Sequence, residues 1–150
     1  MRYLGLDCSS FAVHGVIIDE KEQLISLHKW GSKEKKFDFR FPEIFTKFSE
    51  DLSKIKVIDS AAIEAAIFIQ NPKSTIAIAN VAGAVLGFLV TSKIPTVFID
   101  NRQWKKAILL KGNASKEDIR KFAEDKWGDV FPEQDYADAA CIALWNQRRF

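Results

Sequence analysis

The sequence predicts an α/β protein with a five-stranded mixed sheet and helices on both faces of the sheet. Three strand-like segments with short polar links occupy the first 30 residues, which indicates a three-strand antiparallel meander. Helix-like and strand-like patterns then alternate, as crossovers between two parallel strands require. One later strand is almost continuously apolar, which is typical of a central strand. Residues 1–150 are expected to form a single domain.

The first half of the chain contains the meander, one helix and the apolar strand. The charged residues 31–40 are expected to form a loop. Pro42 then opens an amphipathic helix with apolar residues at helical spacing, namely Ile44, Phe45, Phe48, Leu52 and Ile55. The predicted strands are residues 2–10, 12–19 and 23–30, with a fourth strand that ends near Glu64.

The second half of the chain is mostly helical. Asn71 and Pro72 form a helix-start signature, with asparagine as the N-cap and proline at the first helical position. Ser115 is a second N-cap, followed by an acidic first turn, and Gly128 should end that helix. The predicted elements are a long apolar helix at 72–92, a short strand at 95–99, a basic helix at 101–110, the capped helix, and a final helix at about 133–147.

The histidines and cysteines form no metal-ligand pattern. His14 and His28 fall within the meander, and we expect both to be half-buried or exposed, without a partner that would make either one a ligand. Cys8 and Cys141 lie in separate apolar runs, and no disulfide framework is recognisable. The chain begins without a signal-peptide pattern. We therefore expect a reducing, cytoplasmic location.

One uncharged segment requires a membrane test. Residues 75–92 carry no charge, and Gly83 and Gly87 have the spacing of small residues in paired membrane helices. The run is at the lower limit for a span, Asn80 interrupts it, and no second span exists. We therefore expect a buried helix and no membrane partner.

Four carboxylates lie among small or apolar residues. Asp7 ends an apolar strand, and Glu64 is surrounded by four alanines. Asp135 and Asp138 are three residues apart and share one helical face, and the apolar residues around Asp138 direct it toward the sheet. Alternatively, Glu64 faces a sheet edge, and the two aspartates complement the helix dipole.

If these acids converge, their mutual repulsion must be relieved by cations. Oxygen ligands without a His or Cys cluster favour Mg²⁺ or Mn²⁺ over zinc. Two such ions roughly 4 Å apart can activate water and stabilise the leaving oxygen in phosphodiester hydrolysis.

A basic segment follows the last predicted strand. Between positions 102 and 121 the sequence has seven positive and two acidic residues. The positive residues are Arg102, Lys105, Lys106, Lys111, Lys116, Arg120 and Lys121, and the acidic residues are Glu117 and Asp118. This excess could bind phosphates, or it could be a solvated helix face.

Taken in order, these motifs resemble those of the RuvC-type Holliday-junction resolvases of the ribonuclease H-like superfamily. The resemblance rests on residues 4–7, 63–64, 95–105, 115–116 and 135–140, and it covers nearly the whole chain. Compared with typical members the chain is short, which suggests a compact version of the kind found in phages.

The resemblance implies a homodimer that makes paired, Mg²⁺-dependent nicks in a four-way DNA junction, with no organic cofactor. Its four metal-binding and catalytic acids would be Asp7, Glu64, Asp135 and Asp138. The positions that face DNA in the family correspond to Arg102, Gln103, Lys105 and Lys116. The helix at the family's dimer interface corresponds to residues 72–92, with Ala79, Gly83 and Gly87 on the contact face.

Two features depart from the family pattern. The family follows its first aspartate with Pro-Gly, whereas Cys8 and Ser9 stand here. An aromatic residue that stacks at the junction is expected three positions after the glutamate, where the chain has Ile67. Phe68 comes next, and it either takes this role or belongs to the core.

Two other functions are compatible with the sequence. The chain could be a ribonuclease H-like nuclease that acts on flaps or structured RNA. It could also be a non-catalytic protein that binds branched DNA, although four acids placed where a phosphate must lie argue against this function.

Overall fold

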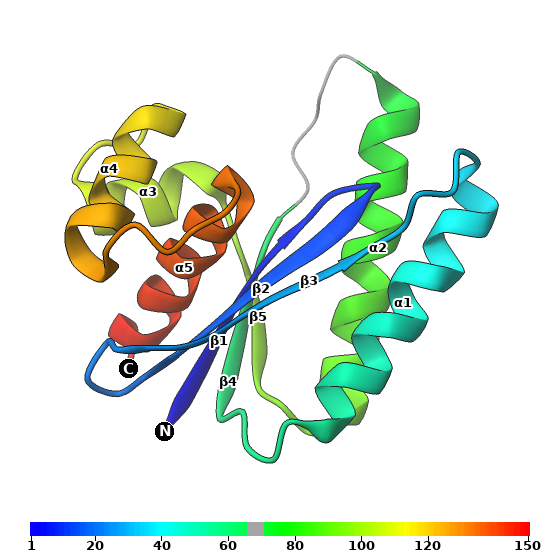
Figure 1. The fold of residues 1–150 in the computed structure, drawn as a ribbon, viewed down its shortest axis with the longest axis horizontal. Coiled ribbons are helices and arrows are strands. Elements are labelled where there is room, and N and C mark those ends of the chain that lie inside the picture. The colour runs from blue at the N-terminus through cyan, green and yellow to red at the C-terminus, as the bar shows by residue number, and fades with distance from the viewer. Residues whose placement is uncertain (66–70) are drawn as a thin grey trace.

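The computed structural model describes residues 1–65 and 71–150 of the chain. Its strands form one mixed sheet in the order β3-β2-β1-β4-β5 (Figure 1). β1 pairs antiparallel with β2, and β2 with β3, whereas β4 lies parallel to both β1 and β5. The strands are β1 (Arg2–Cys8), β2 (Ala12–Asp19), β3 (Leu24–Gly31), β4 (Ser60–Glu64) and β5 (Thr96–Ile99). The predicted α/β class and the mixed sheet are confirmed.

Helices cover both faces of this sheet (Figure 1). Alternate residues of β1 explain the two layers, because Leu4 and Leu6 pack into one apolar cluster and Tyr3 packs into the other. The helices on the Leu4 face are α1 (Phe37–Lys54) and α2 (Pro72–Thr91), and those on the Tyr3 face are α3 (Asn101–Leu109), α4 (Lys116–Trp127) and α5 (Gln134–Arg148).

The predicted caps are present at the helix ends. The Asn71 side chain accepts a hydrogen bond from the Lys73 N–H, and Pro72 is the first residue of α2. Ser115 and Asp118 form a reciprocal capping box at the start of α4, and that helix ends before Gly128. Most element boundaries therefore lie within two residues of those predicted.

The start of α1 was predicted wrongly. The helix begins at Phe37, so part of the expected loop is helical and Pro42 lies inside the helix. Arg40 provides the physical reason, because its buried guanidinium donates to the carbonyl oxygens of Ser10, Glu34 and Lys35. These contacts fix the first turn, and they join residues that are far apart in the sequence.

A glycine in β1 allows α5 to approach the sheet closely. A Cβ atom added to Gly5 would lie 2.2 Å from the Ala139 carbonyl oxygen and 2.3 Å from the Ala143 nitrogen. The facing part of α5 is rich in alanine, and residues 139–144 are fully buried. Backbone therefore packs on backbone at this point, and the first turn of α5 comes to lie beside the end of β1.

We expect Gly5→Ala to destabilise the fold by about 2 kcal/mol or more, because the added methyl meets backbone atoms that cannot rotate away. Urea unfolding of the two proteins measures this loss. Gly112→Ala is the matched control, since the nearest atom to its added Cβ lies 3.5 Å away. Equal losses in the two variants would contradict the importance of the close approach.

Candidate metal centre and its flanking surfaces

Three of the four predicted acids come together at one end of the sheet. Asp7 lies in β1, and Asp135 and Asp138 lie in the first turns of α5. One carboxylate oxygen from each of the three can be chosen so that all lie within 4.8 Å of one another. The structure therefore brings Asp7 together with the two aspartates of α5, as predicted.

The fourth acid, Glu64, lies beside this group and not within it. Glu64 ends β4, the parallel neighbour of β1. Its carboxylate accepts hydrogen bonds from the Trp104 Nε1 at 2.7 Å and from the Asn101 Nδ2 at 3.2 Å. Two residues of α3 thus hold the Glu64 side chain in place, and sequence reasoning identified neither contact.

The electrostatics of the group reflect crowding and burial. Burial raises the pKa of Asp7 well above its ordinary value, and the charges of Asp138, Glu64 and Asp135 raise it further. The pKa of Asp138 is raised to about 6, mainly by burial, although a hydrogen bond from Gln134 opposes the increase. The acidic group therefore carries an electrostatic cost.

The donor set fits a hard divalent cation. In the described part of the chain, no lysine or arginine forms an ion pair with Asp7, Asp135 or Asp138. The three residues offer only carboxylate oxygens, which suit Mg²⁺ or Mn²⁺. A cation at this point would offset the repulsion that raises the pKa of Asp7.

Two cysteines adjoin the acids without joining them. Cys8 follows Asp7, Cys141 lies one helical turn after Asp138, and both are free and buried. Burial and the neighbouring carboxylates raise the pKa of both thiols. Both sulfurs therefore stay protonated.

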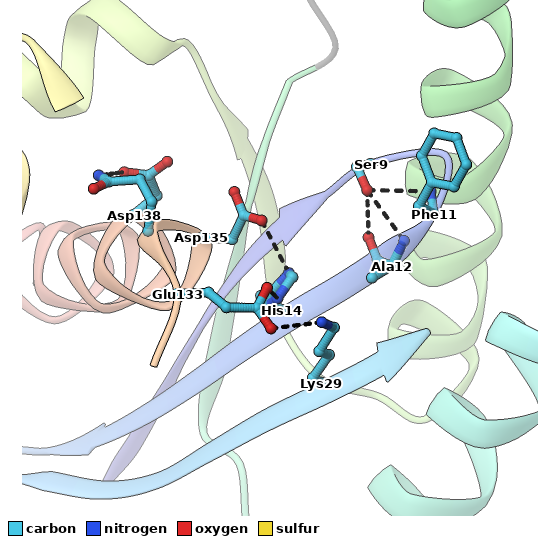
Figure 2. A network of polar contacts seen from close by, with 9 residues as sticks. Ser9, Phe11, Ala12, His14, Lys29, Glu133, Asp135 and Asp138 are labelled. Atoms are coloured by element: carbon cyan, nitrogen blue, oxygen red, sulfur yellow. Dashed lines mark hydrogen bonds and ion pairs between the residues drawn. The ribbon is translucent and has the colours of Figure 1, made fainter. Parts of the chain in front are cut away.

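His14 is a site residue that the sequence prediction missed. It was expected to be half-buried or exposed without a partner, but its side chain is buried. Its ring nitrogens lie 3.3 Å from the Glu133 carboxylate and 3.8 Å from the Asp135 carboxylate (Figure 2). The cause is pairing between β1 and β2, which sets His14 opposite Asp7. Only knowledge of this register could have found the contact.

The environment of the other histidine is as predicted. His28 is half-buried, stacks on Trp30 with ring centroids 5.4 Å apart, and lies 2.7 Å from the Ser26 hydroxyl. It belongs to neither of the two groups of potential ligands found in the described residues.

The predicted DNA-facing residues line the α3 and α4 side of the acids. Arg102 and Gln103 are exposed in the first turn of α3, and Lys116 is exposed at the start of α4. Lys105 is half-buried in α3, and its charge opposes the burial that raises the pKa of Asp138. Within the same basic segment, Lys111 pairs with Asp118 and Arg120 with Glu124. Phe68 lies outside the described residues.

The long apolar helix α2 has an uncovered face. Ile76 and Val90 are 60% and 57% exposed. Five of the exposed positions recur at helical spacing, namely Ile76, Ala79, Gly83, Gly87 and Val90. A Cβ added at either glycine would meet no atom of the described chain within 4 Å.

The same helix passes a membrane-span test by length and composition alone. It is the only such helix among the described residues, and 22% of its most apolar window is buried. A single helix of this kind is weak support for a membrane location. The expectation of a buried helix is met only in part, because one side of α2 packs into the core and most of the window is not buried.

The sheet order, the two helical layers and the acids at the sheet end define a ribonuclease H-like protein. The structure aligns with a Thermus thermophilus RuvC structure, described as a complex with a Holliday junction substrate, with a TM-score of 0.82 and 20% identity over 96% of this chain and 91% of that chain. The chain belongs to the RuvC family, because the model of "Crossover junction endodeoxyribonuclease RuvC" matches residues 4–145.

Curated relatives carry the same description. The chain is 33% identical to the Neisseria meningitidis serogroup C protein over 90 residues, which are 59% of this chain and 51% of that protein. It is 30% identical to the Brachyspira hyodysenteriae protein over 115 residues, covering 77% and 71%. The match thus spans about half the length of the first of these relatives.

We expect Asp138→Asn to stabilise the metal-free protein at neutral pH. The folded pKa of about 6 exceeds the ordinary 3.8, so the folded state holds the Asp138 proton more tightly than the unfolded state does. Ionising this carboxyl therefore destabilises the fold, and the full penalty is present above pH 6. The penalty decreases as the pH falls from 6 toward 3.8. Urea unfolding should therefore show the variant to be more stable above pH 6, with a difference that shrinks on acidification.

Millimolar Mg²⁺ provides the control for this measurement. A cation bound among the acids stabilises the folded wild type and binds the variant more weakly. The stability difference at neutral pH should then narrow or reverse. A difference that is independent of both pH and Mg²⁺ would contradict the clustering of charge at Asp138.

Proposed function

We propose that the chain is a divalent-metal-dependent endodeoxyribonuclease that resolves four-way DNA junctions by paired nicks, acting as a homodimer in the cytoplasm during DNA recombination and repair. Residues 1–150 act as one nuclease domain. The observation that carries the proposal is the grouping of Asp7, Asp135 and Asp138 within 4.8 Å, next to Glu64, in a chain of the RuvC family.

The four acids would hold two Mg²⁺ or Mn²⁺ ions. When bound, such a pair lowers the pKa of water and stabilises the leaving oxygen of a phosphodiester. Asp7 and Asp138 present carboxylates from β1 and α5, and Asp135 completes the group. Glu64 is kept oriented by the Trp104 and Asn101 hydrogen bonds, so it adds a fourth carboxylate with little freedom.

The basic residues on α3 and α4 would supply the affinity for DNA. Arg102, Gln103 and Lys116 are exposed and free to contact phosphates, and Lys105 lies near Asp138. Contacts of this kind are salt-dependent and carry little sequence information. Binding should therefore survive the loss of a metal-binding acid.

The exposed stripe of α2 would form the dimer interface. Ala79, Gly83 and Gly87 let two helix backbones approach closely, and Ile76 and Val90 supply apolar area at the two ends of the stripe. A second copy of α2 would cover this surface. The helix then needs no membrane to account for its apolar composition.

Asp7→Asn and Asp138→Asn should each reduce nicking of a labelled four-way junction by more than about 100-fold in Mg²⁺ while leaving junction binding intact. The amide keeps the shape of the side chain and removes the charge that holds a cation. Gel assays of cleavage and of binding without metal measure the two effects.

Asp125→Asn, which changes an exposed acid of α4, is the control and should cut normally. Flap, duplex and structured RNA substrates complete the panel. Normal junction cleavage by Asp138→Asn would disprove the site assignment, and a preference for flaps or RNA would disprove the substrate assignment.

Gly83→Leu and Gly87→Leu should each weaken the dimer by at least about tenfold, because the added side chain separates the two helices. Neither leucine Cβ meets an atom of its own described chain within 4 Å, so the monomer should remain folded. Analytical ultracentrifugation measures the dissociation constant. Glu50→Leu, on an exposed position of α1, should leave it unchanged, and an unaffected dimer in both glycine variants would place the interface elsewhere.

A further inference from the structure

A groove of about 970 Å³ leads away from the acidic group on the side opposite α3 and α4. One end is lined by Asp135, His14 and Glu133, so the groove is continuous with the candidate metal centre. Its walls come from the turn between β1 and β2, the end of β3, and residues 32–36 together with the start of α1. This turn is where the chain departs from the family's usual Pro-Gly.

The groove has an excess of unpaired positive charge. Lys29 pairs with Glu133 at 2.6 Å, and Lys47 pairs with Glu43 at 2.9 Å, so these four lining charges are satisfied internally. Lys33, Lys35 and Lys36 are exposed, and they form no ion pair in the described part of the chain. Glu34 lines the same stretch and is also without an ion pair among the described residues, so three lysines and one glutamate border a path that begins at the acids.

An exposed phenylalanine, supported by an arginine, lies in the same groove. Phe11 is 63% exposed although it is a large apolar side chain. The Ser9 hydroxyl accepts hydrogen bonds from the Phe11 and Ala12 N–H groups at 3.2 and 3.1 Å (Figure 2). The Arg40 guanidinium lies 4.2 Å from the centroid of the Phe11 ring. The hydrogen bonds thus hold the backbone of Phe11 in the turn, and its ring lies against Arg40 while most of its surface faces solvent.

Arg40, the residue that supports this ring, carries an unpaired positive charge among the described residues. Arg40 is buried, its described partners are backbone carbonyl oxygens, and it makes no ion pair with a described carboxylate. It therefore leaves a positive charge under an aromatic platform. Exposed rings next to lysines match the two needs of unpaired nucleotides, which are a stacking partner and neutralised phosphates.

The geometry points to a binding site for one unpaired DNA strand in this groove, with a base stacked on Phe11 and phosphates at Lys33, Lys35 and Lys36. The identity of the strand as part of a branched substrate rests on the proposed function. A four-way junction opened at its centre supplies such a strand next to the scissile phosphate, and the groove would guide it away from the acids.

The test uses the full-length protein and a single-stranded oligonucleotide carrying 2-aminopurine, whose fluorescence changes when the base stacks on an aromatic ring. Phe11→Leu should weaken binding by at least about fivefold and abolish the fluorescence change, whereas Phe11→Tyr should retain both. Phe150→Leu is the matched control, because Phe150 is 72% exposed and also lies against an arginine, with Arg149 at 4.4 Å.

A triple Lys33→Gln, Lys35→Gln and Lys36→Gln variant tests the phosphate contacts. The slope of log affinity against log salt should fall by about 2, since each single-strand phosphate contributes about 0.7. A triple glutamine variant of the exposed Lys54, Lys56 and Lys93, at the other end of the helices α1 and α2, should keep the wild-type slope.

The outcomes separate this inference from the proposed function. If both groove variants show the fluorescence change and the salt slope of the wild type, the groove is not a binding site for an unpaired strand. This conclusion holds even if the wild type cuts junctions. A wild-type salt slope in the lysine variant alone would overturn the phosphate contacts. Wild-type binding and fluorescence in Phe11→Leu alone would overturn the stacking of a base on Phe11. Junction cleavage by the wild type in Mg²⁺ tests the proposed function separately, and its absence would leave the oligonucleotide result to decide the groove.

Discussion

The backbone contact between Gly5 and α5 is the constraint on which the arrangement of the site depends. Asp135 and Asp138 are more than 120 residues from Asp7 in sequence, and they reach it because α5 packs on β1 without an intervening side chain. The alanine-rich segment at 139–144 presents small side chains at the same contact. A larger residue on either surface would move the carboxylates apart before it affected the rest of the sheet.

This close packing also creates an electrostatic conflict. Asp7 and Asp138 are half-buried beside other acids, and their raised pKa values reflect the free-energy cost of that placement. Two apolar clusters on the faces of the sheet provide the stability that tolerates this cost. The positively charged surfaces lie on both sides of the acids, on α3 and α4 and along the groove to α1, so the acids face solvent between two regions that favour phosphate.

Sequence reasoning predicted the elements well because their signals are local. Periodicity and caps such as Asn71 and Ser115 depend on neighbouring residues. The proximity of Asp7 to Asp135 and Asp138 was also predicted, whereas Glu64 lies beside that group. The interactions of His14 and Arg40 were not predicted, because they depend on strand register and on contacts between distant loops. The orientation of Glu64 by Trp104 was missed for the same reason. These features depend on contacts between residues that are distant in the sequence, and such contacts cannot be predicted from a short segment.

The two buried thiols beside the acids have a consequence for the choice of metal. Cysteine sulfur binds soft and borderline metals such as zinc and copper as thiolate, and the environments of Cys8 and Cys141 oppose thiolate formation. Burial, reinforced by the charge of the neighbouring acids, thus keeps both thiols from competing for a cation. The three clustered acids present only oxygen ligands, with the His14 ring beside Asp135, and alkylating or oxidising reagents gain little access to the two buried thiols.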